Sequence, residues 1–412
     1  MTMSTGTYHD YLFPHDDPRL SGIRGLDPYA YREAAKLDDF TGGLIRNWTP
    51  LYPAPFVGIT TDGAVVPGLF PLEEVPADEA APTAAMVAAA NAFLAALDPE
   101  QTARIRYPMD AVEWGSWSNP EFMIHDTGIR LEFLPEAARD AALALVEASL
   151  SRVGYQQVRT MMRINGWLGE VVDLESVMNE LSYHFALYGE PSPTEPWGWQ
   201  LFGHHMATNC VVIGPRLCLT PTFMGAEPNE IDDGPYRGTQ AFSDRIAKAR
   251  ALIATLDDAR RAAIQVYPDL VDSLPEGRVD PGDERHLGGA FEDNRVVPLE
   301  GASVAGWSEA SREALLAMVA ESTKHYPAGA QRARVRQVAE HLDETWFAWY
   351  GGFGEDDPFY YRIQSPVAMF ELDHHCGVFL SNRTPAVFHI HNVERTPNGN
   401  DYGKAWIAQL RD

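Results

Sequence analysis

Two stretches of the chain show the same order of hydrophobic patterns. Each begins with an apolar segment ending in Leu-Asp, at residues 92–98 or 251–257, and soon reaches a Tyr-Pro pair, at 107–108 or 267–268. Each then carries two segments whose apolar residues recur every three or four positions, which is typical of amphipathic helices. Both stretches therefore predict a helical first part.

The apolar positions of these expected helices can be given in order. In the first stretch they are Leu143, Val146 and Leu150, then Leu174, Val177 and Leu181; in the second they are Leu315, Met318 and Val319, then Val335, Val338 and Leu342. An aromatic segment ending in Tyr-Gly follows in each stretch, at 185–189 or 347–351, and then a His-His pair within β-type sequence. A shared order of five landmarks indicates an internal repeat.

The predicted fold is an α+β protein that is internally duplicated, with helices packed on antiparallel sheets about a pseudo-twofold axis. The two repeats span residues 84–226 and 242–412, and the second carries the candidate metal site. Residues 1–83, rich in Pro, Gly and aromatic residues, predict an irregular N-terminal arm, and the linker between the repeats is rich in turn-forming residues.

The composition limits which binding partners and which cellular compartment we expect for the protein. A formal charge of −26 repels nucleic acid and anionic membranes, so a small-molecule substrate is the expected partner. Three cysteines without CxxC spacing favour a reducing cytoplasm. The N-terminus lacks the pattern of a secretion signal, and no apolar run is long enough to cross a membrane.

The candidate chemistry lies on two strands predicted near the C-terminus, at residues 367–380 and 386–393. Side chains alternate between the faces of a strand, so one face of the first strand is almost wholly apolar while the other carries Glu371, Asp373 and His375. On the second strand, His389 and His391 share a face. The connection at 381–385 is short, which makes the strands antiparallel neighbours with opposite side chains about 4.5–5.5 Å apart.

Three imidazoles and one or two carboxylates in one place predict a transition-metal site. Neutral imidazole suits Cu, Fe or Zn, and a carboxylate balances the charge of the ion. We therefore expect one metal ion, Cu or Fe with Zn as the alternative, bound by His375, His389 and His391, with Glu371 and Asp373 as candidate catalytic carboxylates. Solvated or hydrogen-bonded histidines are the alternative interpretation.

His374 lies on the apolar face in this register and is by default a buried core histidine. It stays a candidate metal ligand because a shift of one residue would exchange it with His375. The first repeat keeps the pair His204 and His205 but lacks the second pair of histidines. With Asn209, these residues either line the same cleft as substrate-binding groups or have a structural role.

Further candidates surround this segment. Arg395 and Lys404 flank an Asn-Gly turn and are candidates for binding a substrate carboxylate or phosphate, with a purely structural loop as the alternative. Trp117 and other aromatic residues are candidates for the wall of an apolar substrate pocket, although core packing is the favoured interpretation for any one of them.

The ending of the chain resembles a known family. Residues 373–380 read D-H-H-x-G-V-F-L, residues 388–403 read F-H-I-H-x-V-x-R-T-P-N-G-N-D-Y-G, and a G-H-H-x-x-x-N segment occupies 203–209. In these motifs the chain is similar to a bacterial and fungal family catalogued as a domain of unknown function. That resemblance extends from about residue 80 and implies no activity.

The expected function is that of a mononuclear metal-dependent enzyme, an oxidoreductase or oxygenase acting on a small organic substrate. A zinc-dependent hydrolase would use the same ligands, with the spare carboxylate as general base. A metal-binding protein without turnover is the third alternative. The chain has no Walker loop, dinucleotide fingerprint or Gly-x-Ser-x-Gly elbow, so nothing supports nucleotide, nicotinamide or serine-hydrolase chemistry.

Overall fold

One mixed sheet runs through the whole molecule. The structure is a computed structural model that describes residues 6–411, and within that range 13 strands belong to a single sheet. Its main path has the order β1-β3-β4-β5-β7-β13-β12-β11-β10-β8. The α+β class is confirmed, but the sheets that we predicted as separate and antiparallel are one sheet with a parallel pair at each end, β1 with β3 and β8 with β10.

The helices and strands follow one another in a similar order in the two halves. The first half contains α4 (Thr83–Ala95), α5 (Pro99–Ile105), β1 (Arg106–Tyr107), β2 (Ile129–Arg130), α6 (Glu136–Ser149), α7 (Arg152–Val172), β3 (Tyr183–Gly189), β4 (Trp197–Gly203), β5 (Met206–Ile213), β6 (Arg216–Cys218) and β7 (Thr222–Ala226). The second contains α8 (Ser243–Thr255), α9 (Asp258–Ile264), β8 (Gln265–Tyr267), β9 (Ala302–Ser303), α10 (Glu309–Ser322), α11 (Ala328–Glu340), β10 (Trp346–Gly351), β11 (Phe359–Gln364), β12 (Met369–His374), β13 (Ile390–Arg395) and α12 (Lys404–Gln409).

The two halves join through one pair of strands. β7 pairs antiparallel with β13, and Gly225 lies opposite His391. The duplication itself stays a prediction.

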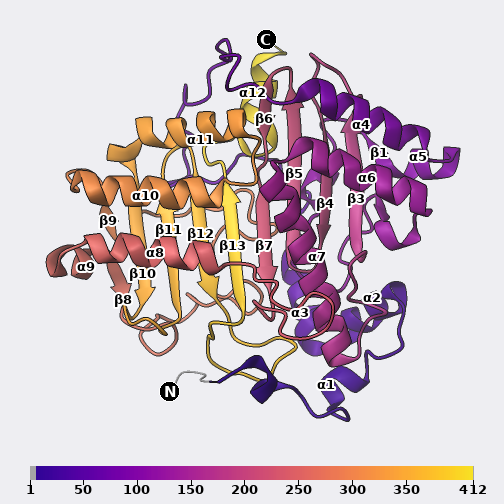
Figure 1. Cartoon of the computed structure of the whole chain (residues 1–412), viewed down its shortest axis with the longest axis horizontal. Helices are drawn as coiled ribbons and strands as arrows, with labels where there is room; N and C mark the ends of the chain where they lie inside the picture. The colour runs from indigo at the N-terminus through magenta and orange to yellow at the C-terminus, as the bar shows by residue number, and fades with distance from the viewer. Residues whose placement is uncertain (1–5, 412) are drawn as a thin grey trace.

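Helices from both halves cover the same face of the sheet (Figure 1). Side-chain caps fix the starts of α7 and α10: Ser151 accepts a hydrogen bond from the Gly154 amide, and Ser308 accepts one from the Ser311 amide. The apolar faces of these helices pack with Phe370 and other strand residues in the largest hydrophobic core. This face of the sheet is therefore sealed from water.

One predicted helix is wrong. The segment of Leu174, Val177 and Leu181 forms turns, and the long helix of the first half is α7, which lies upstream of it. Asp173 ends that helix in the left-handed conformation, with φ of 59°. Leu174 and Val177 are buried against other residues instead, so their helix-like spacing has a different origin.

The N-terminal arm is more regular than we predicted. It contains η1 (Tyr8–Tyr11), α1 (Pro18–Ser21), α2 (Pro28–Leu37) and α3 (Asp39–Trp48), whereas residues 1–5 of the arm lie outside the described range. Asp17, Asp27 and Asp38 cap the three α-helices. The first two caps precede a proline at the first helical position, a start signal that our sequence reading missed.

The other face of β11, β12 and β13 is polar and is covered by an irregular segment, residues 268–301. The Leu287 and Gly288 amides of this segment donate to the carboxylate of Glu371. No helix within residues 6–411 combines the length and apolar character needed to cross a membrane.

The helix–sheet core predicts the cost of one truncation. Leu372 is fully buried between β12 and the helices, so Leu372→Ala should lower the free energy of unfolding by about 2–5 kcal/mol. Urea unfolding measures this loss. Leu37→Ala is the matched control because Leu37 is 87% exposed, and equal losses in both variants would contradict the burial assignment.

Candidate metal centre

The start of strand β13 brings two imidazoles close together, with their ring planes nearly perpendicular. His391 is its second residue and His389 lies just before its start. The Nδ1 atom of His389 lies 2.6 Å from the carbonyl oxygen of Cys376. A carbonyl only accepts, so this Nδ1 carries the proton and Nε2 has a free lone pair, as in a metal-binding histidine. That Nε2 lies 3.1 Å from Nε2 of His391.

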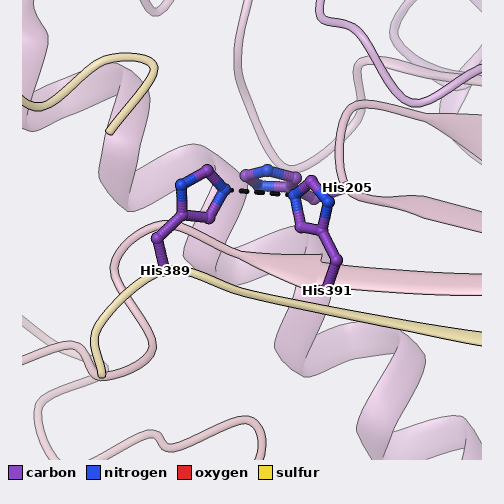
Figure 2. A group of neighbouring side chains, drawn as sticks. All are labelled: His205, His389 and His391. Atoms are coloured by element: carbon purple, nitrogen blue, oxygen red, sulfur yellow. Dashed lines mark hydrogen bonds between the residues drawn. The ribbon is translucent and has the colours of Figure 1, made fainter. Parts of the chain in front are cut away.

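His205 comes to the same point from the first half of the chain. It lies in the two-residue turn between β4 and β5 and has a left-handed backbone, with φ of 60°. Its ring centroid is 5.3 Å from that of His389 and 5.0 Å from that of His391. Figure 2 shows the three rings turned toward a common point. Each residue offers a ring nitrogen within 4.8 Å of those of the other two.

A second group of three shares His391 with the first. Its other members are His286, from the 268–301 segment, and His375, directly after β12. The Nδ1 atom of His391 is 3.4 Å from Nε2 of His286, and the rings of His375 and His391 have centroids 3.7 Å apart. We call His205, His286, His375, His389 and His391 the histidine cluster.

Each of these nitrogen–nitrogen distances fits a pair of ligands on one ion. Two ligands at about 2.0–2.1 Å from a tetrahedral metal lie about 3.3 Å apart, so the observed 3.1 and 3.4 Å need little adjustment. Several ring nitrogens of the cluster, among them Nδ1 of His205 and Nε2 of His375, are buried without a hydrogen-bond partner among the described residues. Buried histidine groups of this chain could therefore hold a metal ion.

Burial keeps four of the imidazoles neutral. It lowers the pKa of His286 to about 4, and it lowers the pKa values of His205, His375 and His391 well below the usual value of histidine. Neutral imidazole is the form that binds metals. These four side chains are thus ready to coordinate a cation at neutral pH without first losing protons from charged rings.

The carboxylates near the cluster have internal partners. Asp373 lies opposite His391, and one of its oxygens is 3.1 Å from Nε2 of His375. It also accepts hydrogen bonds from the amide and Nε of Arg285, at 3.0 and 2.7 Å. Glu284 pairs with Arg285 too, and one of its oxygens is 3.8 Å from Nδ1 of His375. Glu284, Asp373 and His375 form a third group that could hold an ion.

A cavity of about 690 Å³ reaches the cluster. His205, His375 and His391 line its inner end, beside residues 376–379 of the loop that follows β12. Its remaining walls include side chains of α1, α2 and α3 and the segment 119–122. A small molecule in this cavity would contact three of the five imidazoles.

Comparison with known proteins gives a family and no activity. A family model described as "Protein of unknown function (DUF3500)" matches residues 79–404. The chain belongs to the DUF3500 family. The searches of curated proteins and of solved structures each returned no match. All five residues of the cluster lie inside the part that the DUF3500 model matches, whereas α1, α2 and α3 lie outside it.

The structure separates our other candidate residues in this DUF3500 chain from the cluster. Glu371 lies on the expected face of β12, but its carboxylate is occupied by Tyr360 Oη at 2.6 Å and by two backbone amides. His374 lies on the opposite face with its Nδ1 2.7 Å from the Phe359 carbonyl, as the predicted register implies. Neither residue belongs to a group of described residues that could hold a metal ion.

Arg395 is a buried structural residue. Its guanidinium donates to Asp401 at 2.8 Å, to Asp293 at 2.5 Å and to the Gly288 carbonyl at 2.9 Å. Lys404 begins α12, beyond the end of β13 that lies away from His391. Neither residue lines the cavity, so their predicted contact with substrate beside the metal has no geometric support.

The candidates of the first half divide between two places. His205 joins the cluster, and His204 stacks on its ring with centroids 3.8 Å apart. Asn209 lies in the core, with its amide donating to the Pro221 carbonyl and its carbonyl accepting from Gln200. Trp117 is buried against Phe223 and donates to Tyr402. The last two have packing roles and do not line the cavity.

Two features of the site escaped the sequence reading. His286 lies in a turn-rich segment without strand periodicity. The adjacent charged residues Glu284 and Arg285 are the signal in the sequence that could have indicated it. The predicted strand ends were also wrong, because residues 375–389 form a loop. The carboxylate of Glu227 holds this loop through the amides of Val378 and Leu380, at 2.8 and 3.1 Å.

A methyl group beside the cluster should weaken metal binding in this DUF3500 chain. A Cβ at Gly225 would lie 2.8 Å from Cδ2 of both His205 and His391, so Gly225→Ala must push these rings apart. We expect metal affinity to fall by about tenfold or more, the size of effect seen for residues that orient ligands. Competition with a chelator measures it. Gly43→Ala is the control, since its Cβ meets only a side-chain atom at 3.8 Å, and unchanged affinity in Gly225→Ala would contradict the geometry.

Arg395→Met should damage stability and spare the site. Removing one partner of a buried ion pair leaves its carboxylates uncompensated, which costs about 3–5 kcal/mol. Thermal and urea unfolding measure the loss, and the folded fraction should bind metal as the parent protein does. The exposed Arg383 supplies the control variant Arg383→Met. If the variant had normal stability but lost metal or ligand binding, Arg395 would have a role in the site and not in stability.

Proposed function

We propose that this protein is a metal-dependent oxidoreductase that binds copper at His205, His389 and His391 and acts on a small, largely apolar organic molecule. One observation carries the proposal: three buried imidazoles converge beside a cavity of about 690 Å³. When bound, the copper ion would supply one-electron redox chemistry. The chain's own residues hold it, exclude water and orient the substrate.

The chemistry of the donors supports a transition metal. Nδ1 of His205 is buried without a partner, which costs about 1–3 kcal/mol, and a metal ion bound by this ring would offset that cost. Imidazole suits Cu, Fe, Ni and Zn, and divalent copper binds most tightly in this series. Non-haem iron sites commonly add a carboxylate to two histidines, but the group of His205, His389 and His391 contains none.

The carboxylates favour an oxidoreductase over a zinc hydrolase. A hydrolase of the kind we considered needs a free general base near metal-bound water. Glu227 is 3.8 Å from Nδ1 of His389, but its oxygens accept from the loop amides. Asp373 is held by Arg285, and Glu371 by Tyr360 and two amides. Each of these carboxylates is already committed to an internal partner.

The cavity supports a largely apolar substrate. Apolar and aromatic lining residues include Leu20, Tyr31, Trp48, Phe122 and Phe379. Four charged side chains share the wall and would orient a polar substituent: Arg19, Asp38, Glu121 and Glu284. Helices α1, α2 and α3 form part of the cavity wall but lie outside the family match. We therefore infer that the shape of the substrate that fits the cavity is specific to this chain and is not shared across the family.

The strand order supports the duplication that we inferred from sequence. In each half a parallel pair at the sheet edge is followed by antiparallel strands up to the central β7–β13 pair. On this view the ligand-bearing ends of the two repeats meet at the pseudo-twofold axis, where the first repeat supplies His205 and the second supplies the other ligands.

A cytoplasmic location also stays an expectation.

Copper reconstitution tests the proposal. Apoprotein loaded with copper, iron or zinc salts should retain copper most tightly, and the copper form should oxidise members of a panel of small aromatic and aliphatic compounds with oxygen and a reductant present. His389→Ala and His391→Ala should both lose the metal and the activity while far-UV circular dichroism stays unchanged. Elemental analysis and mass spectrometry of products give the two readouts.

The control for these variants is His374→Ala, which removes a buried histidine on the other face of β12. It should retain the metal. Stoichiometric metal in His389→Ala or His391→Ala would contradict the ligand assignment. If the protein retains only zinc and hydrolyses its substrates, the hydrolase hypothesis would be correct and the oxidoreductase hypothesis wrong. If it retains a metal but turns over no substrate, it would be a metal-binding protein.

A further inference from the structure

The two ring nitrogens of His391 face different groups of ligands. Nε2 lies 3.1 Å from Nε2 of His389, and Nδ1 lies 3.4 Å from Nε2 of His286. The nitrogens of an imidazole point away from each other, so a single ion cannot use both of them. His391 therefore belongs to two coordination sites through two different atoms.

A chain of hydrogen bonds shows where the protons lie. Nδ1 of His389 donates to the Cys376 carbonyl, so Nε2 of His389 must accept from Nε2 of His391. With its proton on Nε2, His391 accepts at Nδ1 from Nε2 of His286. One proton on His391 thus separates the two groups of ligands, and metal ions on both sides would displace it.

The surroundings of the second group suit a cation. Asp373 lies 3.1 Å from Nε2 of His375, Glu284 lies 3.8 Å from its Nδ1, and Asp283 lies 3.7 Å from Nε2 of His286. Arg285 provides a positive charge next to Asp373 and Glu284. The first group, by contrast, consists of imidazoles with Glu227 at its margin. The two sites therefore differ in charge.

We propose that the protein binds two metal ions per chain, bridged by His391 as an imidazolate. One ion is held by His205, His389 and Nε2 of His391, and the other by His286, His375 and Nδ1 of His391, with Asp373 or Glu284 beside it. Binding the pair removes the ring proton of His391 and releases it to solvent, with no change in oxidation state. This inference rests on the proposed metal site and adds a second, different site to it.

Copper titration with electron paramagnetic resonance tests the bridge. Apoprotein titrated with Cu(II) and passed through a desalting column should retain two ions per chain. At two equivalents the integrated spin should fall well below two per chain, because an imidazolate couples the two Cu(II) spins magnetically. Proton release in a weakly buffered solution should exceed that of a variant without His391.

Variants separate the two sites. His286→Gln should retain one copper per chain with its full, uncoupled signal, and His286→Ala repeats the test if the glutamine binds metal. His184→Ala is the control, since His184 is a buried histidine that stacks on Phe202 away from the cluster. It should keep two coupled ions.

The remaining outcomes distinguish this inference from the proposed function. One copper per chain in the parent protein, unchanged in His286→Gln, overturns the second site and leaves the first intact. Two ions with a fully integrated, uncoupled signal overturn the bridge. No retained copper in the parent protein overturns the bridge and the proposed function together.

Discussion

The site depends on the pairing of β7 with β13 at the centre of the sheet. This pair places Gly225 against His391, and the missing side chain of the glycine leaves room for the rings of His205 and His391 to approach. Imidazoles from chain segments far apart in sequence therefore meet where water is excluded. In that environment an imidazole keeps its lone pair, because burial opposes protonation.

A second set of interactions fixes the orientation of the site. Arg285 bonds Asp373 and donates to the carbonyl of His374, so it joins the 268–301 segment to the end of β12. His286 follows directly and is carried to His391. Glu227 likewise holds the loop of residues 375–389, because its carboxylate accepts hydrogen bonds from three backbone amides of that loop. These charged side chains hold the backbone around the histidine cluster, and this explains why they are unavailable for chemistry.

Local periodicity in the sequence predicted which residues share a face near the C-terminus. Alternation along β12 separated the face of Leu372 and His374 from that of Asp373, and the register pairs Asp373 with His391 as an antiparallel arrangement requires. His389 and His391 meet as predicted, although His389 lies in the loop just before β13 and not within a strand. What local patterns could not reveal was the long-range packing: the arrival of His286 from an irregular segment, or the internal partners of Glu371 and Arg395. Helix-like spacing also misled at Leu174, whose burial comes from packing in turns.

Metal coordination by the histidine cluster is the proposal on which the others rest. Anomalous diffraction from crystals grown with Cu(II), recorded on both sides of the copper absorption edge, locates a bound ion. We expect a peak at bonding distance, about 2.0 Å, from Nε2 of His389, with His205 and His391 around it. Density without a peak there, in which each ring is hydrogen-bonded to a water molecule or a carbonyl, would contradict this proposal.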